Sequence, residues 1–132
     1  MKQIHEILNR RPTVLFAYLF GSKAKGNSNG RSDWDIAIYF KGPFRKRENW
    51  ATFNLEALLS RAIGGEVQVT TLNEGLPPVL AFEIVKDGIL LLDRNIDVRM
   101  DFENRMLRYY HDWQYFLKRQ MESERQLAHR KS

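Results

Sequence analysis

Residues 20–36 of the chain read FGSKAKGNSNGRSDWDI and connect two segments that we expect to pair in one sheet. The segment before it, Val14–Phe20, is a continuous apolar run with β-branched and aromatic members, as in a buried strand. The segment after it, residues 33–40, alternates between two sets of side chains: Ile36, Ile38 and Phe40 against Asp33, Asp35, Ala37 and Tyr39. The Gly-Ser pair and the polar linker therefore predict a connection between two neighbouring strands.

The rest of the chain alternates between helical and strand-like patterns. Apolar residues at helical or strand spacing, with Pro and Gly as stop signals, set the expected boundaries. We expect helices over residues 2–10, 49–62 and 77–86, and strands over residues 66–72 and 89–92. This alternation is typical of an α+β or α/β domain, in which a small mixed sheet carries helices on its faces.

A long final helix is expected over residues 97–128, where no Pro or Gly occurs. It would be about 48 Å long, whereas a small domain is about 30 Å wide, so part of it must project or pack on something else. Its aromatic residues are Tyr109, Tyr110, Trp113, Tyr115 and Phe116. Tyr110 and Tyr115 fall outside the stripe formed by the other three, which favours contact with a partner or a second copy over a wholly intramolecular core.

The composition fits one domain, residues 1–132, with 43% hydrophobic residues and a formal net charge of +5. The absence of cysteine excludes disulfides, thiolate zinc sites and a cysteine nucleophile. No apolar run approaches about 18 residues, and the polar start is unlike a signal peptide, so we expect a cytoplasmic protein without membrane association. The excess of Lys and Arg over Asp and Glu favours anionic partners. No helix-turn-helix DNA-binding motif is recognisable, so direct DNA binding is not expected.

A phosphate-binding turn is expected where the first strand ends. Gly21 and Ser22 leave the strand and open a helical turn, which would present backbone N–H groups and a hydroxyl to phosphate oxygens. Lys23 and Lys25 add positive charge nearby. The alternative is an ordinary loop in which these lysines are only solvated charges.

Asp33 and Asp35 lie two residues apart on the second expected strand, so both side chains project from one face of the sheet. Two adjacent carboxylates repel each other and favour a bound hard cation, usually Mg²⁺ shared with substrate phosphates. A phosphate-binding turn beside such a pair suits nucleotidyl transfer. The alternative is that both aspartates are only turn and strand-end residues.

The segment GSKAKGNSNGRSDWDIAI resembles the GS-x₉₋₁₀-DxD signature of the polymerase-β-like nucleotidyltransferases, with ten residues between Ser22 and Asp33. Over nearly its full length the chain also resembles the minimal nucleotidyltransferases (MNT proteins) encoded beside HEPN-domain ribonucleases. The resemblance implies a small mixed sheet with helices, Mg²⁺ as cofactor and ATP as substrate. It also implies an antitoxin that forms a hetero-oligomer with a HEPN ribonuclease toxin, and either caps the toxin or transfers AMP to one of its tyrosines.

The same resemblance assigns roles to individual residues. Asp33 and Asp35 would be the catalytic residues and the ligands of Mg²⁺. Gly21 would let the backbone approach the nucleotide, and Ser22 would contact its β- or γ-phosphate. The full set of nucleotide-binding residues that the resemblance implies is Gly21, Ser22, Lys25 and Ser32.

The expected third strand departs from the family pattern. The family carries a third carboxylate there, in a pattern like V-D-V-V-x-L, whereas residues 66–72 read EVQVTTL and place Gln68, expected to be half-buried, at the Asp position. A neutral amide cannot act as a base for an incoming hydroxyl. Glu66 is the nearest substitute on the same strand face, although it lies about 6.6 Å further along the strand.

Three functions therefore stay open from the sequence. The first is an antitoxin that transfers AMP to its toxin, and the second is a scaffold that neutralises the toxin by binding alone, with the long helix as the partner-binding candidate. The third is nucleotidyl transfer to a small molecule or a tRNA end, which is disfavoured because 132 residues leave little room for a separate substrate domain.

Overall fold

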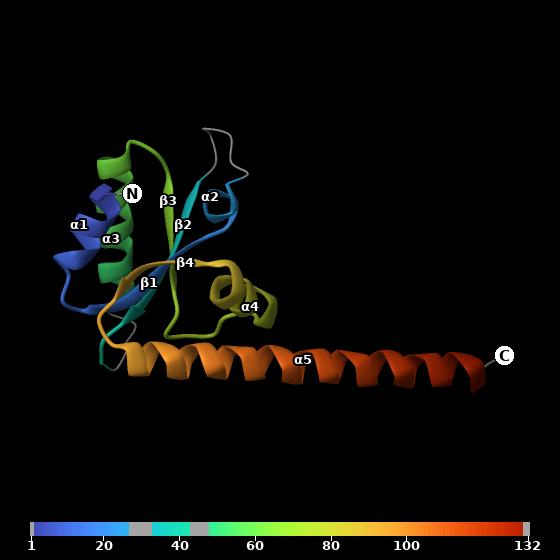
Figure 1. Ribbon diagram of the computed structural model, residues 1–132. Coiled ribbons are helices and arrows are strands. Elements are labelled where there is room, and N and C mark those ends of the chain that lie inside the picture. The colour runs from blue at the N-terminus through green and yellow to red at the C-terminus, as the bar shows by residue number, and fades with distance from the viewer. Residues whose placement is uncertain (1, 27–32, 43–47, 131–132) are drawn as a thin grey trace.

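The computed structural model describes residues 2–26, 33–42 and 48–130, and within them four strands form one sheet with helices on both of its faces (Figure 1). The elements are, in chain order, α1 (Lys2–Asn9), β1 (Val14–Phe20), α2 (Ser22–Lys25), β2 (Trp34–Phe40), α3 (Glu48–Ile63), β3 (Val67–Thr71), α4 (Pro78–Asp87), β4 (Ile89–Asp93) and α5 (Ile96–Arg130). The expected order of helices and strands is confirmed, and most boundaries lie within two residues of the sequence-based ones.

The sheet is mixed, as expected, with the strand order β3-β2-β1-β4. The central strand β1 pairs antiparallel with β2 and with β4, whereas β2 and β3 run parallel. A parallel pair needs a crossover, and α3 supplies it between β2 and β3. The third strand begins at Val67, so Glu66, expected inside it, lies just before it and accepts a 3.0 Å hydrogen bond at its backbone oxygen from the N–H of Trp34.

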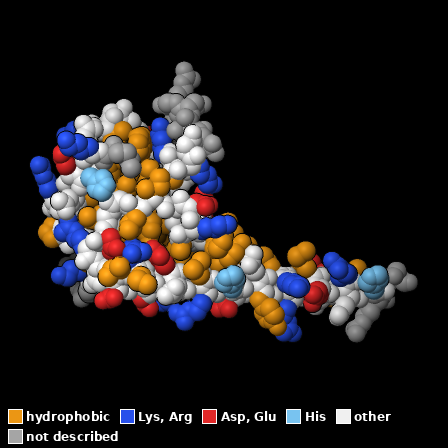
Figure 2. Space-filling view, viewed as in Figure 1, with side chains coloured by type: hydrophobic (Ala, Val, Ile, Leu, Met, Phe, Trp, Pro, Cys, Tyr) orange, Lys and Arg blue, Asp and Glu red, His pale blue; other side chains and the backbone are white. Residues whose placement is uncertain are grey.

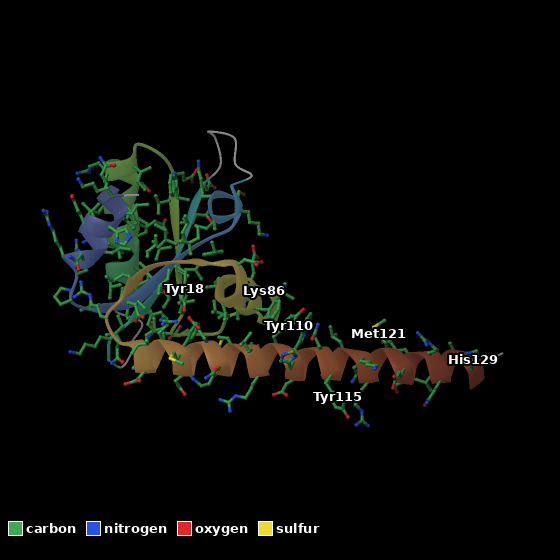
Figure 3. All side chains as sticks on the ribbon, viewed as in Figure 1. Tyr18, Lys86, Tyr110, Tyr115, Met121 and His129 are labelled. Carbon is green, nitrogen blue, oxygen red and sulfur yellow. The ribbon has the colours of Figure 1, made fainter. Side chains whose placement is uncertain are left out.

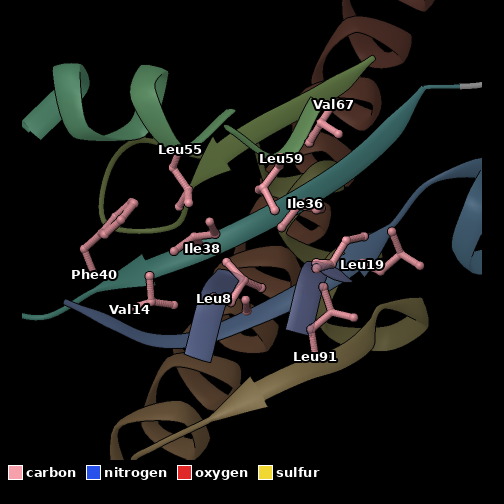
Figure 4. Packing of buried hydrophobic residues seen from close by; sticks show 12 residues of the cluster. Leu8, Val14, Leu19, Ile36, Ile38, Phe40, Leu55, Leu59, Val67 and Leu91 are labelled. Atoms are coloured by element: carbon pink, nitrogen blue, oxygen red, sulfur yellow. The ribbon is translucent and has the colours of Figure 1, made fainter. Parts of the chain in front are cut away.

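Strand alternation divides the core into two clusters, one on each face of the sheet. On the face covered by α1 and α3, β2 contributes Ile36 and Ile38 to a cluster with Leu8 and Leu59 (Figure 4). On the opposite face, β1 contributes Phe16, Tyr18 and Phe20 to a cluster closed by α4 and α5. The odd-numbered residues of β2, Asp35 among them, therefore face the α4–α5 side.

A hydrogen-bonded network fixes the start of α5 to the sheet. The buried Tyr18 hydroxyl donates to Glu103 at 2.6 Å, and Arg99 donates to Glu103 at 2.8 Å and to Asp93 at 2.7 Å. Burial and the neighbouring Glu103 carboxylate raise the pKa of Tyr18, so its hydroxyl stays protonated and remains a donor. The network connects β1, β4 and α5, and it determines the direction in which α5 leaves the domain.

α5 has a docked half, residues 96–113, and a projecting half, residues 114–130 (Figures 1 and 3). The helix is 35 residues and about 52 Å long, so it extends well beyond the domain, as expected. One expectation is wrong: Tyr110 is covered within the chain, because its ring stacks on Phe82 of α4 with centroids 4.0 Å apart. Tyr115 is 63% exposed, as expected. In the part of the chain that the structure describes, no helix is long and apolar enough to span a membrane.

Candidate functional site

The fold brings Gly21 and Asp35 into contact, although fourteen positions separate them in the sequence. Phe20 and Asp35 are register partners in the antiparallel β1–β2 pair, which places the start of the Gly-Ser turn beside the carboxylate. Gly21 has φ +76° and ψ −153°, a backbone conformation that is essentially confined to glycine, and a Cβ atom there would lie 2.5 Å from Oδ2 of Asp35. Only glycine can adopt this conformation and also leave room for the Asp35 carboxylate, so no other residue fits at position 21.

The turn after Gly21 is a single helical turn, α2. The N–H of Lys25 donates to the backbone oxygen of Gly21 at 3.2 Å, and the N–H of Gly26 donates to that of Ser22. Gly26 closes the turn in a left-handed conformation, with φ +70°. The side chains of Ser22 and Lys25 are exposed, so both are accessible to a ligand. Ser32, the other expected nucleotide-binding residue, lies outside the described residues.

Asp35 is the second residue of β2 and Asp33 lies directly before the strand, and both side chains are half-buried. Strand alternation directs the side chain of Asp35 to the α4–α5 face, and Asp33 lies near enough to act on it electrostatically. Burial first, and then the carboxylates of Asp33 and Glu83, raise the pKa of Asp35. A bound cation would reduce the repulsion among these carboxylates, so the electrostatics of the site favour metal binding.

The donor set fits a hard divalent cation with oxygen ligands. In the described part of the chain no three acidic or histidine side chains are arranged to hold a metal among themselves. Asp33 and Asp35 would therefore hold Mg²⁺ together with substrate phosphates and water, which is the usual way in which proteins bind this ion.

Gln68 lies directly beside Asp35. The two residues are register partners in the parallel β2–β3 pair, so their side chains share the α4–α5 face. Gln68 is exposed rather than half-buried, which corrects the sequence-based expectation, because β3 is an edge strand of the sheet. The position that carries an acid in the family is thus beside Asp35, but here it presents a neutral amide.

Glu83 of α4 belongs to the site and was not expected from the sequence. Its carboxylate pairs with Lys25, with Nζ and Oε1 3.3 Å apart, and it also contributes to the raised pKa of Asp35. The expected substitute, Glu66, is not among the carboxylates that act on Asp35. No motif in the sequence points to Glu83, because only the packing of α4 across the sheet brings it to α2.

The two lysines of the turn have different partners. Nζ of Lys23 lies 5.0 Å from the ring centroid of Trp34, whose ring packs against the cluster on the α1–α3 face. Lys25 instead pairs with Glu83 on the face that carries Asp35. Lys25 is therefore the lysine of this turn that lies on the side of the two aspartates.

Comparison with known proteins finds a sequence relative and solved structures that resemble this chain. The protein adenylyltransferase MntA of Aphanizomenon flos-aquae (strain 2012/KM1/D3) is 26% identical over 108 residues, which cover 76% of this chain and 71% of that protein. Among solved structures, a chain of a toxin–antitoxin complex with AMP-PNP matches with a TM-score of 0.75 at 24% identity, over 92% of this chain and 95% of that one. A chain from a complex of a tri-AMPylated HEPN toxin with an MNT antitoxin, from Shewanella oneidensis, matches with a TM-score of 0.68 at 21% identity, over 92% and 95% of the two chains.

The structural matches show a shared fold, and a family model extends the match to sequence. The model described as polymerase beta, nucleotidyltransferase matches residues 2–97, which include the Gly-Ser turn, the aspartate pair and all four described strands. The chain therefore belongs to the polymerase beta nucleotidyltransferase family.

Proposed function

We propose that this protein is the antitoxin of a HEPN/MNT toxin–antitoxin pair and transfers AMP from ATP to a tyrosine of its partner, a HEPN ribonuclease toxin. The observation that carries the proposal is the contact between the Gly21 turn and the Asp35 carboxylate, which joins a phosphate-binding element to a metal-binding one. The relative named protein adenylyltransferase and the tri-AMPylated toxin bound to a structural relative support this choice of reaction. ATP and the RNA substrates of such a toxin are cytoplasmic, so we place the pair there.

Each part of the site has a task in this reaction. Ser22 and Lys25 would bind the β- and γ-phosphates, and Gly21 would let the backbone approach them without a side chain in the way. Asp33 and Asp35 would hold Mg²⁺, which supplies positive charge to the phosphates when bound. The tyrosine oxygen forms a bond to the α-phosphorus, the bond to the β-phosphate oxygen breaks, pyrophosphate leaves, and the phenolic proton passes to water.

The projecting half of α5 is the proposed docking element for the toxin. It exposes a series of large apolar side chains: Tyr115, Phe116, Leu117, Met121 and Leu127. A helical segment of this length without tertiary packing is marginally stable in water, so a partner would also stabilise it. Because α5 passes α4 before it projects, a protein docked there would lie beside the site (Figure 1).

A second function, neutralisation by binding alone, is favoured by one observation. Gln68 presents a neutral amide beside Asp35, where the family has an acid. If the third carboxylate is indispensable, the site would retain the family's shape without its chemistry. The exposed projecting half of α5 would then be sufficient for function.

The deciding experiment is intact-mass spectrometry of the toxin encoded alongside, after incubation with this protein, ATP and Mg²⁺. We expect mass gains in whole AMP units, and no gain with Asp33→Ala or when Mg²⁺ is chelated. Size-exclusion chromatography of the same mixtures reports complex formation separately. A stable complex without any mass gain would contradict AMP transfer and support neutralisation by binding alone.

A further inference from the structure

The ion pair between Lys25 and Glu83 connects the two elements on either side of the candidate site. Lys25 is the last residue of α2, one helical turn after Gly21, and Glu83 lies in the middle of α4. Their charged atoms are 3.3 Å apart, and the side chains are 46% and 32% exposed. The pair is thus accessible to solvent and to any ligand that enters between α2 and α4.

Glu83 also acts on Asp35, one of the two proposed metal-binding carboxylates. It is one of the two carboxylates that disfavour the ionised form of Asp35, the other being Asp33. Lys25 is the cation that pairs with Glu83 in this group. A triphosphate bound at the Gly-Ser turn would bring further negative charge to the same place, so it would be attracted by Lys25 and repelled by Glu83.

We propose that Lys25 exchanges Glu83 for the nucleotide phosphates when ATP binds, so that Glu83 is a built-in competitor that sets ATP affinity. This inference rests on the proposed function, since it assumes that ATP binds at the Gly-Ser turn. Glu83 is a positioning residue in this scheme: it acts on the nucleotide through Lys25 and does not contact the reacting atoms. In the nucleotide-free protein Glu83 pairs with Lys25 beside the site. When ATP binds, this ion pair breaks and Lys25 pairs with the phosphates instead.

The energetics permit such an exchange. A salt bridge between partly exposed side chains changes an equilibrium by a factor of only about two to five, so a phosphate can displace it. Phosphate also forms charge-assisted hydrogen bonds with lysine that are at least as strong as those of a single carboxylate. Removing the Glu83 charge should therefore tighten nucleotide binding, because it frees Lys25 and removes a repulsive charge.

The test is calorimetric titration of the full-length protein with AMP-PNP in the presence of Mg²⁺, combined with AMP transfer to the partner at saturating ATP. We expect Glu83→Gln to bind AMP-PNP about three- to tenfold more tightly than the unmodified protein. Lys25→Gln should bind AMP-PNP about tenfold more weakly than the unmodified protein. When Glu83→Gln is added to Lys25→Gln, the affinity for AMP-PNP should rise less than about twofold, because Lys25 is no longer there to exchange Glu83 for the phosphates. Asp87→Asn removes an exposed carboxylate from the same helix and should leave affinity unchanged.

The possible outcomes separate this inference from the proposed function. If the unmodified protein does not bind AMP-PNP, the proposed function is wrong and the inference with it. If it binds, but Glu83→Gln binds no more tightly, only the inference is overturned. A loss of kcat above tenfold in Glu83→Gln with unchanged affinity would also overturn it, since Glu83 would then serve the chemistry directly. Circular dichroism of each variant confirms that the fold is retained.

Discussion

Gly21 shows how one residue can be required for two separate reasons. Its φ of +76° is costly for any residue with a side chain, and its Cα faces the Asp35 carboxylate at a distance that leaves no room for a Cβ atom. The first reason is conformational and concerns the turn. The second is steric and concerns the site, because a displaced Asp35 could no longer share a cation with Asp33.

Gly21→Ala should therefore impair both stability and activity. The backbone conformation of Gly21, with φ +76° and ψ −153°, alone costs about 1–3 kcal/mol with a Cβ atom present, and the contact with Asp35 adds to it. We expect a lower melting temperature and at least a hundredfold loss of AMP transfer, measured by mass spectrometry. Gly26→Ala is the control for a positive φ away from the aspartates: Gly26 has φ +70° and ψ 11°, and no atom lies within 4 Å of the added Cβ, so the variant should lose stability with little loss of transfer.

Asp35→Asn should separate stability from activity. Burial and the carboxylates of Asp33 and Glu83 raise the pKa of Asp35 in the folded protein, so the ionised form is disfavoured there relative to the unfolded chain. The folded state thus binds this proton more readily, and the charged group lowers stability at pH values above its raised pKa. Replacing it with a neutral amide removes that cost, whereas AMP transfer should be abolished because the proposed metal site would lose a ligand.

The measurement is thermal unfolding without Mg²⁺ as a function of pH. Asp35→Asn should melt at a higher temperature than the unmodified protein at neutral pH. The difference should shrink as the pH falls through the raised pKa of Asp35, where the carboxylate becomes protonated. A variant that is less stable at neutral pH would show that the ionised carboxylate makes a favourable interaction instead.

At the level of elements, the network of Tyr18, Arg99 and Glu103 determines how α5 is attached. Tyr18 lies in the central strand, and its hydroxyl reaches Glu103 of the helix across the second core cluster. Arg99 connects the same carboxylate to Asp93 at the end of β4. Stacked and tilted aromatic rings from β1, β2 and α5 pack beside this network, namely Phe16, Tyr39 and Phe102.

Tyr18→Phe should weaken this attachment without a change of fold. The ring remains buried, but the hydrogen bond to a charged acceptor is lost, while Glu103 keeps its pairing with Arg99. We expect a loss of about 1–2 kcal/mol in the free energy of unfolding, measured by urea titration. Tyr115→Phe is the matched control, because the Tyr115 hydroxyl lies on the exposed part of α5, and its change should stay below about 0.5 kcal/mol.

One part of the candidate site depends on how the elements pack and could not be predicted from the sequence. The Gly-Ser turn and the aspartate pair are close in the sequence and joined by one strand pairing, so their proximity could be expected. Glu83 lies about 50 positions from Asp35, on a helix without any motif. Its place beside Lys25 depends on how α4 packs across the sheet, and sequence periodicity does not contain that information.

The whole molecule combines a domain with a helix that projects from it (Figure 2). The projecting half of α5 is exposed along its described length, and Figure 3 shows Met121 and Tyr115 pointing to opposite sides of it. In this view Met121 lies on the same side of α5 as α4 and the candidate site. A partner on that side would contact both the helix and the domain, which is the geometry that transfer to a protein requires.

The double variant Leu117→Glu, Met121→Glu should therefore bind the toxin much more weakly but bind the nucleotide as before. Both side chains are exposed, at 37% and 61%, so the domain should retain its melting temperature. If each is an anchor of the interface, the complex should weaken at least about a hundredfold in calorimetry with the toxin, while AMP-PNP binding stays unchanged. Asn104→Glu, exposed on the docked half, is the control. Unchanged complex formation would exclude this part of α5 as the docking element.

The sequence by itself determined the order of elements, the mixed sheet, the turn at Gly21 and the shared face of Asp33 and Asp35. These features depend on local rules: the alternation of a strand, the spacing of a helix, and the conformational freedom of glycine. It also identified the length of the last helix, because the absence of Pro and Gly over residues 97–128 is a local property.

The tertiary structure decided what those local rules leave open. It covered Tyr110 with Phe82, exposed Gln68 on an edge strand, and brought Glu83 to Lys25. Each of these outcomes depends on which elements become neighbours, and neighbours are chosen by the packing of the whole core rather than by the residues concerned. That is why the Gly-Ser turn and the aspartate pair could be recognised in the sequence, whereas the acidic residue that lies beside them could not.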